Sequence, residues 1–196
     1  MRGAAHKGKF STAGVDSTEL GRILRDLARF NGAMLGHWPV LQWLGRAIKD
    51  VPVEQSLTFV DIGCGYGDLL RAVRGWVRKR GRAMKLIGID LSPQVIDIAR
   101  DATDAADDIE YQAADVFEFK PTVPIDFVTN SLLTHHLTDE MIMCFLRWME
   151  TSARRGWVIY DLQRSRVPFY FIPLAGLLLR IHPVVVMTGA FPSRAH

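Results

Sequence analysis

The sequence has only two cysteines, Cys64 and Cys144, and their separation matches no metal-ligand spacing. This scarcity argues against a disulfide framework and predicts a reducing, cytoplasmic location. The formal net charge is only +3, so composition gives no general argument for nucleic acid binding. Residues 1–15 are basic and rich in small residues, but no apolar stretch follows them. We therefore expect a flexible leader there rather than a secretory signal.

Long uninterrupted apolar runs are also missing. The stretch 169–187 comes nearest, but Pro173, Arg180, His182 and Pro183 interrupt it. A membrane-spanning helix needs about 20 predominantly apolar residues. We therefore expect residues 169–187 to form an interfacial or partner-facing segment, through which the chain contacts a second copy or a membrane surface.

Alternating strand and helix patterns dominate the rest of the chain. Five short apolar runs rich in β-forming residues are present: Leu57–Ile62, Lys85–Asp90, Ile109–Ala113, Ile125–Asn130 and Trp157–Leu162. Helical patterns separate most of them, and a length of 196 residues fits a single domain. This alternation predicts an α/β, Rossmann-like, doubly wound fold, in which a mostly parallel sheet carries helices on both faces.

Several helix starts are marked by capping residues. Asp16 precedes a helical pattern, and Glu19 three residues later completes a capping box. A second short helix is predicted over residues 39–49. Ser92 followed by proline, and Thr138 followed by two acids, predict two further helix N-termini.

One basic stretch and one acidic stretch raise the question of a charged binding surface. Residues 71–85 contain seven Lys or Arg and no acid, and five acids lie between residues 101 and 110. Arg71, Arg74 and Arg78 fall opposite an apolar helix face, and no ladder of aromatic residues accompanies them. We therefore predict that both stretches are solvated faces rather than a nucleic acid or metal site.

Three glycines at alternate positions follow the first predicted strand. They are Gly63, Gly65 and Gly67, and Asp61 precedes them in the segment DIGCGYG. After a strand, such glycines allow a tight turn and let a ligand contact bare backbone. The spacing differs from the G-x-G-x-x-G of dinucleotide-binding proteins. A carboxylate at this place repels a pyrophosphate and attracts an ammonium group, although a plain tight turn is the alternative.

The segment from Asp61 to Gly67 resembles motif I of the class I S-adenosylmethionine-dependent methyltransferases. This resemblance implies S-adenosyl-L-methionine as the cofactor. It implies that Asp61 faces the cofactor's amine, directly or through water. It also implies that the backbone of Gly63, Cys64, Gly65 and Gly67 approaches the cofactor closely.

The ends of the later predicted strands extend the resemblance. It implies that Asp90, with Leu91 beside it, accepts hydrogen bonds from the ribose hydroxyls. Asp115 matches the residue that meets the adenine amino group, and the Val116 amide lies nearby. Asn130, at the end of the fourth strand, is a further cofactor-site residue with an orienting role. The alternatives are that Asp90 caps a helix and that Asp115 is a turn acid.

A His-His-Leu segment after the fourth predicted strand resembles bacterial small-molecule methyltransferases that modify quinones and polyketides. The loop after that strand is expected to face the transferred methyl group. His135 is therefore the predicted general base, with His136 as the alternate and a structural role as the alternative. Adjacent histidines point in different directions, so no metal site is predicted.

The resemblance yields a division of the chain and a function. Residues 1–15 are the leader, 16–56 an N-terminal helical cap, 57–166 the S-adenosylmethionine-binding methyltransferase core and 167–196 an atypical apolar tail. The implied function is methyl transfer to a small acceptor such as a phenol, a quinol or a polyketide-like acid, with no nucleic acid partner. A catalytically impaired relative and a nicotinamide-dependent oxidoreductase are the alternatives.

The tail departs from the family pattern. The common seven-stranded sheet of the family ends with a helix and an antiparallel strand pair. Residues 163–196 hardly accommodate these elements, and they offer one convincing strand, Val184–Met187. We therefore expect an incomplete C-terminal strand pair and six strands at most. A truncated or altered C-terminus is the leading explanation, and it puts substrate binding in question.

Overall fold

The computed structural model describes residues 16–33, 36–134 and 137–161. Its helices are α1 (Ser17–Ala33), α2 (Trp38–Ala47), α3 (Asp68–Arg78), α4 (Pro93–Asp101) and α5 (Asp139–Ser152), with a short 3-10 helix, η1 (Ala105–Asp107). Its strands are β1 (Leu57–Ile62), β2 (Met84–Asp90), β3 (Ile109–Ala113), β4 (Ile125–Ser131) and β5 (Ala153–Tyr160). No helix within these ranges is long and apolar enough to cross a membrane.

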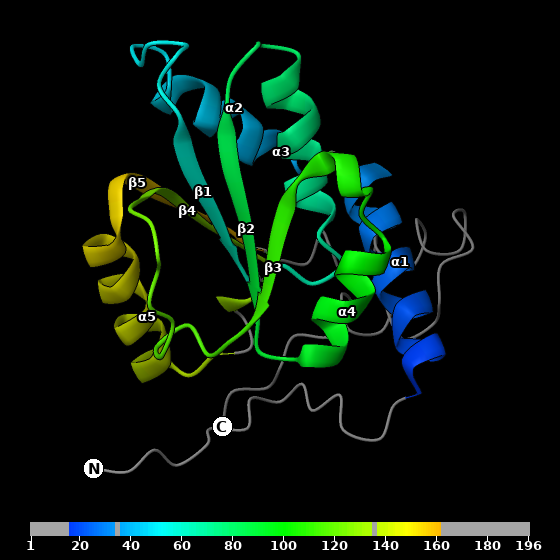
Figure 1. Cartoon of the computed structure of the whole chain (residues 1–196). Helices are drawn as coiled ribbons and strands as arrows, with labels where there is room; N and C mark the ends of the chain where they lie inside the picture. Colours follow the sequence, from blue (N-terminus) through cyan, green and yellow to red (C-terminus); the bar gives the residue numbers. More distant parts are fainter. Residues whose placement is uncertain (1–15, 34–35, 135–136, 162–196) are drawn as a thin grey trace.

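The five strands form one parallel sheet in the order β3-β2-β1-β4-β5 (Figure 1). The chain winds outward from β1 in one direction through β2 and β3, and then crosses to the other side of β1 to add β4 and β5. Ligands of such sheets bind where the winding reverses, beyond the carboxyl ends of the strands. Here that point lies between β1 and β4. The predicted doubly wound fold is confirmed.

The predicted helix starts are also confirmed. The Asp16 carboxylate accepts hydrogen bonds from two backbone N–H groups in the first turn of α1. The side chains of Ser92 and Thr138 accept one each at the starts of α4 and α5. These interactions span two or three residues, which is why the local sequence predicts them.

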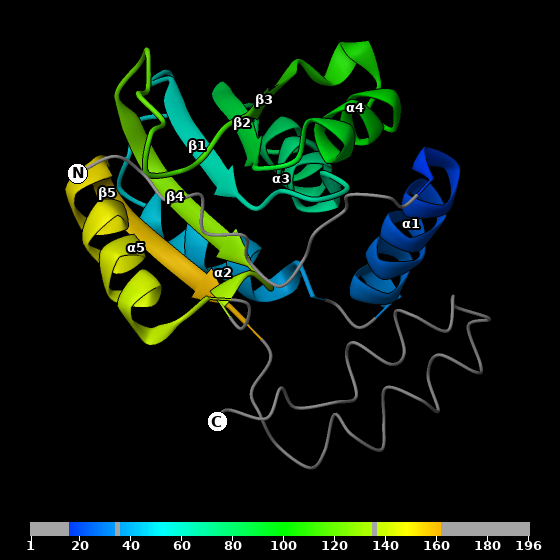
Figure 2. The same cartoon turned by 90° about the horizontal axis from the view of Figure 1, so that it is seen from below.

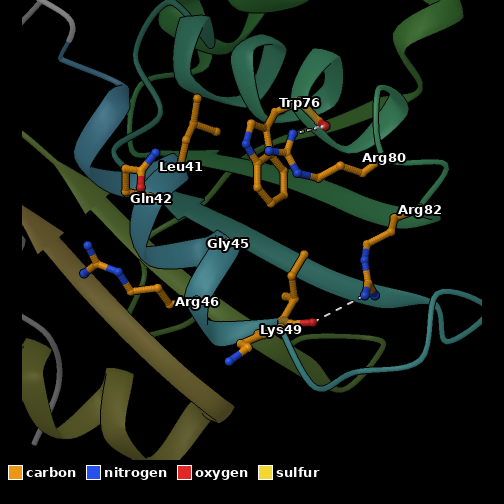
Figure 3. Close-up of a pocket in the computed structure, with 9 residues that line it drawn as sticks. Leu41, Gln42, Gly45, Arg46, Lys49, Trp76, Arg80 and Arg82 are labelled. Carbon is orange, nitrogen blue, oxygen red and sulfur yellow. Dashed lines mark hydrogen bonds between the residues drawn. The ribbon is translucent and has the colours of Figure 1, made fainter.

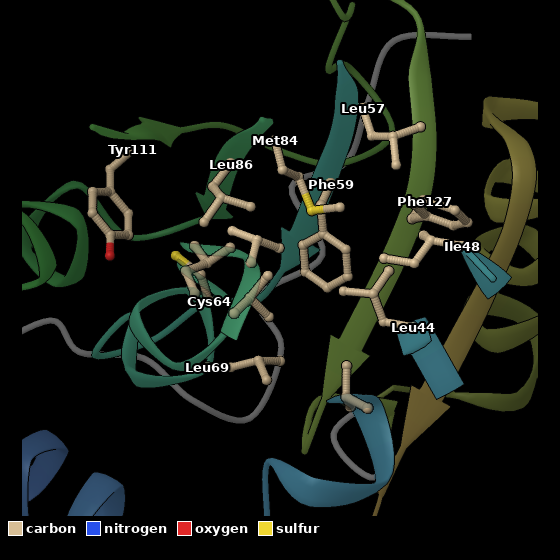
Figure 4. Packing of buried hydrophobic residues seen from close by; sticks show 14 of the residues in the cluster. Leu44, Ile48, Leu57, Phe59, Cys64, Leu69, Met84, Leu86, Tyr111 and Phe127 are labelled. Carbon is tan, nitrogen blue, oxygen red and sulfur yellow. The ribbon is translucent and has the colours of Figure 1, made fainter. Parts of the chain in front are cut away.

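Helices cover the sheet on both faces. On one face, α2, α3 and α4 pack over Phe59 and Phe127, which are fully buried (Figure 4). The helix α5 covers the other face (Figure 2). Its residues Phe145 and Met149 belong to a second buried cluster that includes Val60 of β1. Side chains alternate between the two faces of a strand, so neighbouring residues of β1 belong to different clusters.

The prediction of a solvated arginine face on α3 is confirmed for the exposed Arg78 and is wrong for Arg74. Arg74 is buried and donates to the carbonyl oxygens of Met84 and Asp108, at 3.0 and 2.8 Å. Arg71 and Arg78 also donate to groups of the segment that leads from α4 into β3. A guanidinium has five N–H donors and can satisfy several buried carbonyls at once. The arginines therefore fasten α3 to its neighbours, and the acidic stretch supplies part of their partners.

Some predictions concern residues outside the described ranges. The leader 1–15, His135 and His136, and the tail 167–196 with its candidate strand Val184–Met187 belong to this group. The described ranges contain five strands, so the limit of six stays a prediction. The division of the chain into leader, cap, core and tail also stays a prediction.

Candidate functional site

The glycine loop follows β1 directly and has an unusual backbone. Gly63, Gly65 and Gly67 all have positive φ angles, of 71°, 51° and 73°. A Cβ at Gly67 would lie 2.2 Å from the Tyr111 hydroxyl oxygen, so packing excludes a side chain there. A Cβ at Gly65 would meet no atom of the described residues within 4 Å. The loop therefore packs closely against Tyr111 at Gly67, and it borders open space at Gly65.

A cavity of about 110 Å³ lies at the carboxyl ends of β1 and β4. Its lining comes from the glycine loop with Asp61, from the ends of β4 and β5, and from one side of α1. The lining residues are Leu24, Leu27, Ala28, Asn31, Gly36, His37, Asp61, Gly63, Cys64, Gly65, Tyr66, Asp68, Leu69, Ser131, Leu132 and Tyr160. The predicted residues Asp61, Gly63, Cys64 and Gly65 are thus brought together at the place where the winding of the sheet reverses.

Asp61 is buried with a relative exposure of 2%. Its pKa is raised well above the ordinary value of 3.8, first by burial and then by the nearby carboxylates of Asp68 and Asp90. Its Oδ1 atom is buried and has no hydrogen-bond partner among the described residues. A buried carboxyl oxygen without a partner is costly. A cationic ligand group that donates to it would remove that cost.

Asp90 ties the glycine loop to the end of β2. Its Oδ2 accepts from the Gly65 amide at 3.2 Å, and its Oδ1 accepts from the Ser92 amide at 3.0 Å. Burial raises the pKa of Asp90, while these amide donors act in the opposite direction. Asp90 therefore orients the start of α4, but Ser92 itself is the helix cap. It supports the loop from outside the lining of the 110 Å³ cavity.

Two predicted residues beyond β2 and β3 are exposed. Leu91 is 66% exposed, and the exposed Asp115 accepts a hydrogen bond from the Phe117 amide at 2.9 Å. Asp115 thus has the geometry of a turn acid, with its second carboxylate oxygen available. Val116 packs against the buried cluster on the α5 side of the sheet. None of these three lines the cavity.

Asn130 connects two neighbouring strands of the sheet. It is fully buried, and its Nδ2 donates to the carbonyl oxygen of Ile62 at 2.8 Å, which joins the carboxyl ends of β4 and β1. Its Oδ1 has no hydrogen-bond partner within the described ranges. Asn130 therefore holds together the two strands that flank the cavity without lining it.

The cavity also contains a histidine–carboxylate pair that the sequence does not predict. His37 Nε2 lies 2.7 Å from Asp68 Oδ2, and both residues line the cavity. His37 immediately precedes α2, and Asp68 is the first residue of α3. A signal was present, since His37 lies two residues before Pro39, the predicted start of the second helix. Its partner is 31 residues away, and only the packing of α2 against α3 brings the two together.

The loop after β4 is fastened to the end of β5. Leu132 has a positive φ of 60°, and its amide donates to the Tyr160 carbonyl oxygen at 2.9 Å. The Thr134 hydroxyl donates to the Asp161 carboxylate. These bonds fix the described part of the loop in which the sequence places the general base.

Comparisons with known proteins indicate the family of the chain. The profile of a family described as methyltransferase domain matches residues 59–156, which is half of the chain. Trans-aconitate 2-methyltransferase of Azoarcus sp. (strain BH72) is 29% identical over 99 residues, covering 48% of this chain and 36% of that protein. Demethylmenaquinone methyltransferase of Staphylococcus aureus (strain MRSA252) is 23% identical over 125 residues, covering 63% and 50%. The chain thus spans half or less of the length of these curated relatives.

A solved structure supports the fold. The magnesium protoporphyrin IX methyltransferase of Synechocystis PCC 6803, with bound SAH, aligns with a TM-score of 0.55. The alignment covers 74% of this chain and 63% of that chain at 17% sequence identity. At this identity the likeness concerns the fold alone.

Proposed function

Because the chain belongs to the methyltransferase domain family, we propose that it transfers a methyl group from S-adenosyl-L-methionine to a small-molecule acceptor. The names of the two curated relatives, trans-aconitate and demethylmenaquinone methyltransferases, support an acceptor of this size. The sequence favours a phenol, a quinol or a polyketide-like acid. We further propose the cytoplasm as its location, and residues 169–187 as a contact surface for a second copy or a membrane.

The observation that carries the proposal is the buried Asp61 carboxyl with its unpartnered oxygen. Together with Asp68 and Asp90, it makes the glycine loop acidic. S-adenosylmethionine carries an ammonium and a sulfonium, so this surface attracts it. A nicotinamide dinucleotide carries a pyrophosphate, which the same three acids repel. The comparisons give no support to the oxidoreductase alternative.

The described residues divide the cofactor's contacts among them in our proposal. Asp61 accepts from the ammonium, and Gly63 and Gly65, which carry no side chain, let the amino-acid end of the cofactor approach the backbone of the loop. The 110 Å³ cavity is sized for that end only. Asp90 has lone pairs left for the ribose hydroxyls, and Leu91 offers an exposed apolar side chain to the adenine.

The neighbouring Asp115 and Val116 complete the proposed adenine contacts. The second oxygen of Asp115 accepts from the adenine amino group, and the Val116 amide lies close to the ring. Asn130 keeps the strand ends that border the cavity in place. The lining of the cavity by α1 supports the division into a cap over residues 16–56 and a core over 57–166.

When bound, the cofactor supplies a methyl group on a sulfonium, which is already a good electrophile. The chain then has to align the acceptor and take its proton. His135 remains the predicted base, and His37 is a second candidate because it lines the cavity. If His37 donates from Nε2 to Asp68, its Nδ1 lone pair stays free to accept a proton.

Two measurements on the full chain test the proposed function. Calorimetry should show saturable binding of S-adenosylhomocysteine and none of NAD. A screen with methyl-labelled cofactor against phenols, quinols and polyketide-like acids, read by mass, should then find an acceptor. Binding of NAD in preference to S-adenosylhomocysteine would overturn the proposal. Binding of S-adenosylhomocysteine with no methylated product in the screen would favour the catalytically impaired alternative.

Variants of the two histidines locate the base once an acceptor is found. The true base, replaced by Asn, should lower turnover by about 10²–10⁴-fold while cofactor affinity changes little. His37→Asn and His135→Asn are matched in chemistry. Asp68→Asn should reproduce part of the His37→Asn effect if this pair is the base, and it should have little effect if His135 is. A few-fold effect for both histidine variants would mean that neither is the base.

A further inference from the structure

A second cavity, of about 310 Å³, lies between the later halves of α2 and α3 (Figure 3). Both helices begin at the glycine-loop end of the sheet, where His37 bonds to Asp68, and both end beside the amino ends of β1 and β2. The cavity is therefore separate from the candidate cofactor site. Its volume falls within the range of pockets that bind small molecules.

The lining of this second cavity is basic. Among the residues that the structure describes, it includes Arg46, Lys49, Arg80 and Arg82 and no acidic residue. In Figure 3, Arg80 and Arg82 border the open space next to Gly45, whereas the side chains of Arg46 and Lys49 extend away from it. No hydrogen bond or ion pair occupies the Lys49 ammonium within the described ranges. Like charges gathered without counter-charges repel one another, and a bound anion relieves that repulsion.

Two of these cations are held in position by the fold. The Arg80 guanidinium carbon lies 3.8 Å from the centroid of the Trp76 ring, and its Nη1 donates to the Trp76 carbonyl oxygen at 3.3 Å. The Arg82 guanidinium donates to the carbonyl oxygens of Ile48, Val51 and Pro52. Each guanidinium has five N–H donors, so both retain donors for a ligand. Little side-chain freedom is then left to lose on binding.

An indole ring forms one wall of the cavity. A Cβ at Gly45 would lie 3.3 Å from Trp76 Cζ2, which shows how closely α2 approaches the ring. Leu41 adds apolar surface to the same lining. The cavity therefore offers fixed positive charge beside a small apolar wall, the combination that suits a compact anion with a carbon skeleton.

We propose that this cavity binds a small polyanion whose phosphate or carboxylate groups contact Arg80 and Arg82. The proposal does not depend on methyltransferase activity. Phosphate and carboxylate share the chemistry that a guanidinium recognises. The recessed setting between two helices favours a small ligand over an extended polymer.

The test uses the full chain, with inorganic pyrophosphate and citrate as probes in separate calorimetric titrations. We expect saturable binding of at least one of them. Arg80→Ala should lower the affinity by about tenfold, because it removes one of the two guanidinium groups that make charge-assisted hydrogen bonds to the anion. Arg22→Ala removes one exposed positive charge from α1 and should leave the affinity unchanged. Circular dichroism melts verify that every variant folds.

A fluorescence measurement gives an independent readout. Binding should change the tryptophan emission of the wild-type chain, and Trp76→Phe should abolish that change while calorimetric binding persists. The titration that gives the tighter binding identifies phosphate or carboxylate as the preferred group. Failure of both anions to bind would overturn the proposal. An equal loss in Arg22→Ala, or binding of a single-stranded oligonucleotide more tightly than of either anion, would overturn it as well.

Discussion

The two ends of α3 present opposite charges to their surroundings. At its start, Asp68 joins Asp61 and Asp90 around the glycine loop. At its end, Arg80 and Arg82 line the second cavity. The helix dipole favours this polarity, because anions are stabilised at helix N-termini and cations at C-termini. Charge segregation alone is therefore explained by the fold, and it does not by itself indicate a ligand at either end.

What separates a binding site from a stable helix end is the state of the individual groups. At the acidic end, Asp61 is buried with an oxygen that no described residue satisfies, and Gly65 leaves open space. At the basic end, Arg82 is largely used by backbone carbonyls, whereas Lys49 has no partner among the described residues. Substitutions of specific residues at the acidic end and at the basic end test this difference.

Removal of Asp90 should have the largest effect. Asp90→Ala deletes the proposed acceptor of two ribose hydroxyls and also frees the Gly65 amide. Hydrogen bonds to a charged group contribute roughly 1.5–3 kcal/mol each, so affinity for S-adenosylhomocysteine should fall by about 100-fold or more. Calorimetry measures this, with Asp97→Ala as the control because that carboxylate is 70% exposed on α4. Unchanged affinity in Asp90→Ala would contradict the assignment of the acidic end.

Gly65 and Gly81 provide a matched pair for the next effect. Both have positive φ, 51° and 61°, and a Cβ at either meets no atom of the described residues within 4 Å. An alanine in the left-handed region costs about 1–2 kcal/mol, so both variants should lose similar stability in thermal unfolding. Only Gly65→Ala should also weaken cofactor binding, by about 10–100-fold, because overfilling a fitted site costs roughly 1–3 kcal/mol. Equal binding by the two variants would show that Gly65 does not border the cofactor.

At the basic end, Arg82 and Arg80 should differ in their effect on stability. Arg82→Ala removes hydrogen bonds to three carbonyls and should lower the free energy of unfolding by about 1–3 kcal/mol. Arg80→Ala removes an exposed cation–π contact and should cost about 0.5–1 kcal/mol. Urea denaturation measures both. If Arg80→Ala lowers the free energy of unfolding more than Arg82→Ala does, the contact of Arg80 with Trp76 stabilises this end of α3 more than the hydrogen bonds from Arg82 to the segment after α2.

The smallest effect concerns pH. The pKa of Asp61 is raised in the folded protein, so its contribution to stability is present below the ordinary value of 3.8 and is lost as pH rises through the raised value. Asp61→Asn removes this loss. At pH 8 the ligand-free variant should melt above wild type, on a scale in which 1 kcal/mol shifts the melting temperature by about 2–4 °C for a chain of this size. The difference should shrink towards pH 4.

Added S-adenosylhomocysteine sharpens the same measurement. The ligand's ammonium should stabilise wild type more than Asp61→Asn, because only wild type offers a carboxylate. The difference between the two melting temperatures should then narrow or change sign when the ligand is present. Asp97→Asn, an exposed substitution on α4, serves as the control. If Asp61→Asn and Asp97→Asn behave alike, burial of Asp61 has no energetic consequence for binding.

Local features made much of the fold predictable. The strands Leu57–Ile62 and Ile109–Ala113 have the bounds expected from the sequence, because short β-rich runs between helical patterns specify them directly. The caps at Ser92 and Thr138 are interactions within a single helical turn. The glycine loop was predictable because its residues are adjacent in the chain.

Features that depend on packing were not predictable. The bond between His37 and Asp68 spans 31 residues, and Arg74 reaches the Asp108 carbonyl oxygen across 34. A helical pattern shows which residues share a face, but it does not show what that face meets. The basic cavity likewise arises only when α2 lies beside α3.

The position of β1 has a consequence for how the chain folds during synthesis. β1 is made first among the strands, yet one of its neighbours, β4, is made much later. The Thr58 amide can donate its hydrogen bond to the Asp126 carboxylate only after a residue 68 positions further along has been synthesised. The same separation applies to the hydrogen bond that Asn130 donates to the Ile62 carbonyl oxygen. Until then the central strand is an open edge with apolar side chains, the kind of surface that aggregates. Pairings of such long range form slowly, so we expect the docking of β4 to limit the rate of folding.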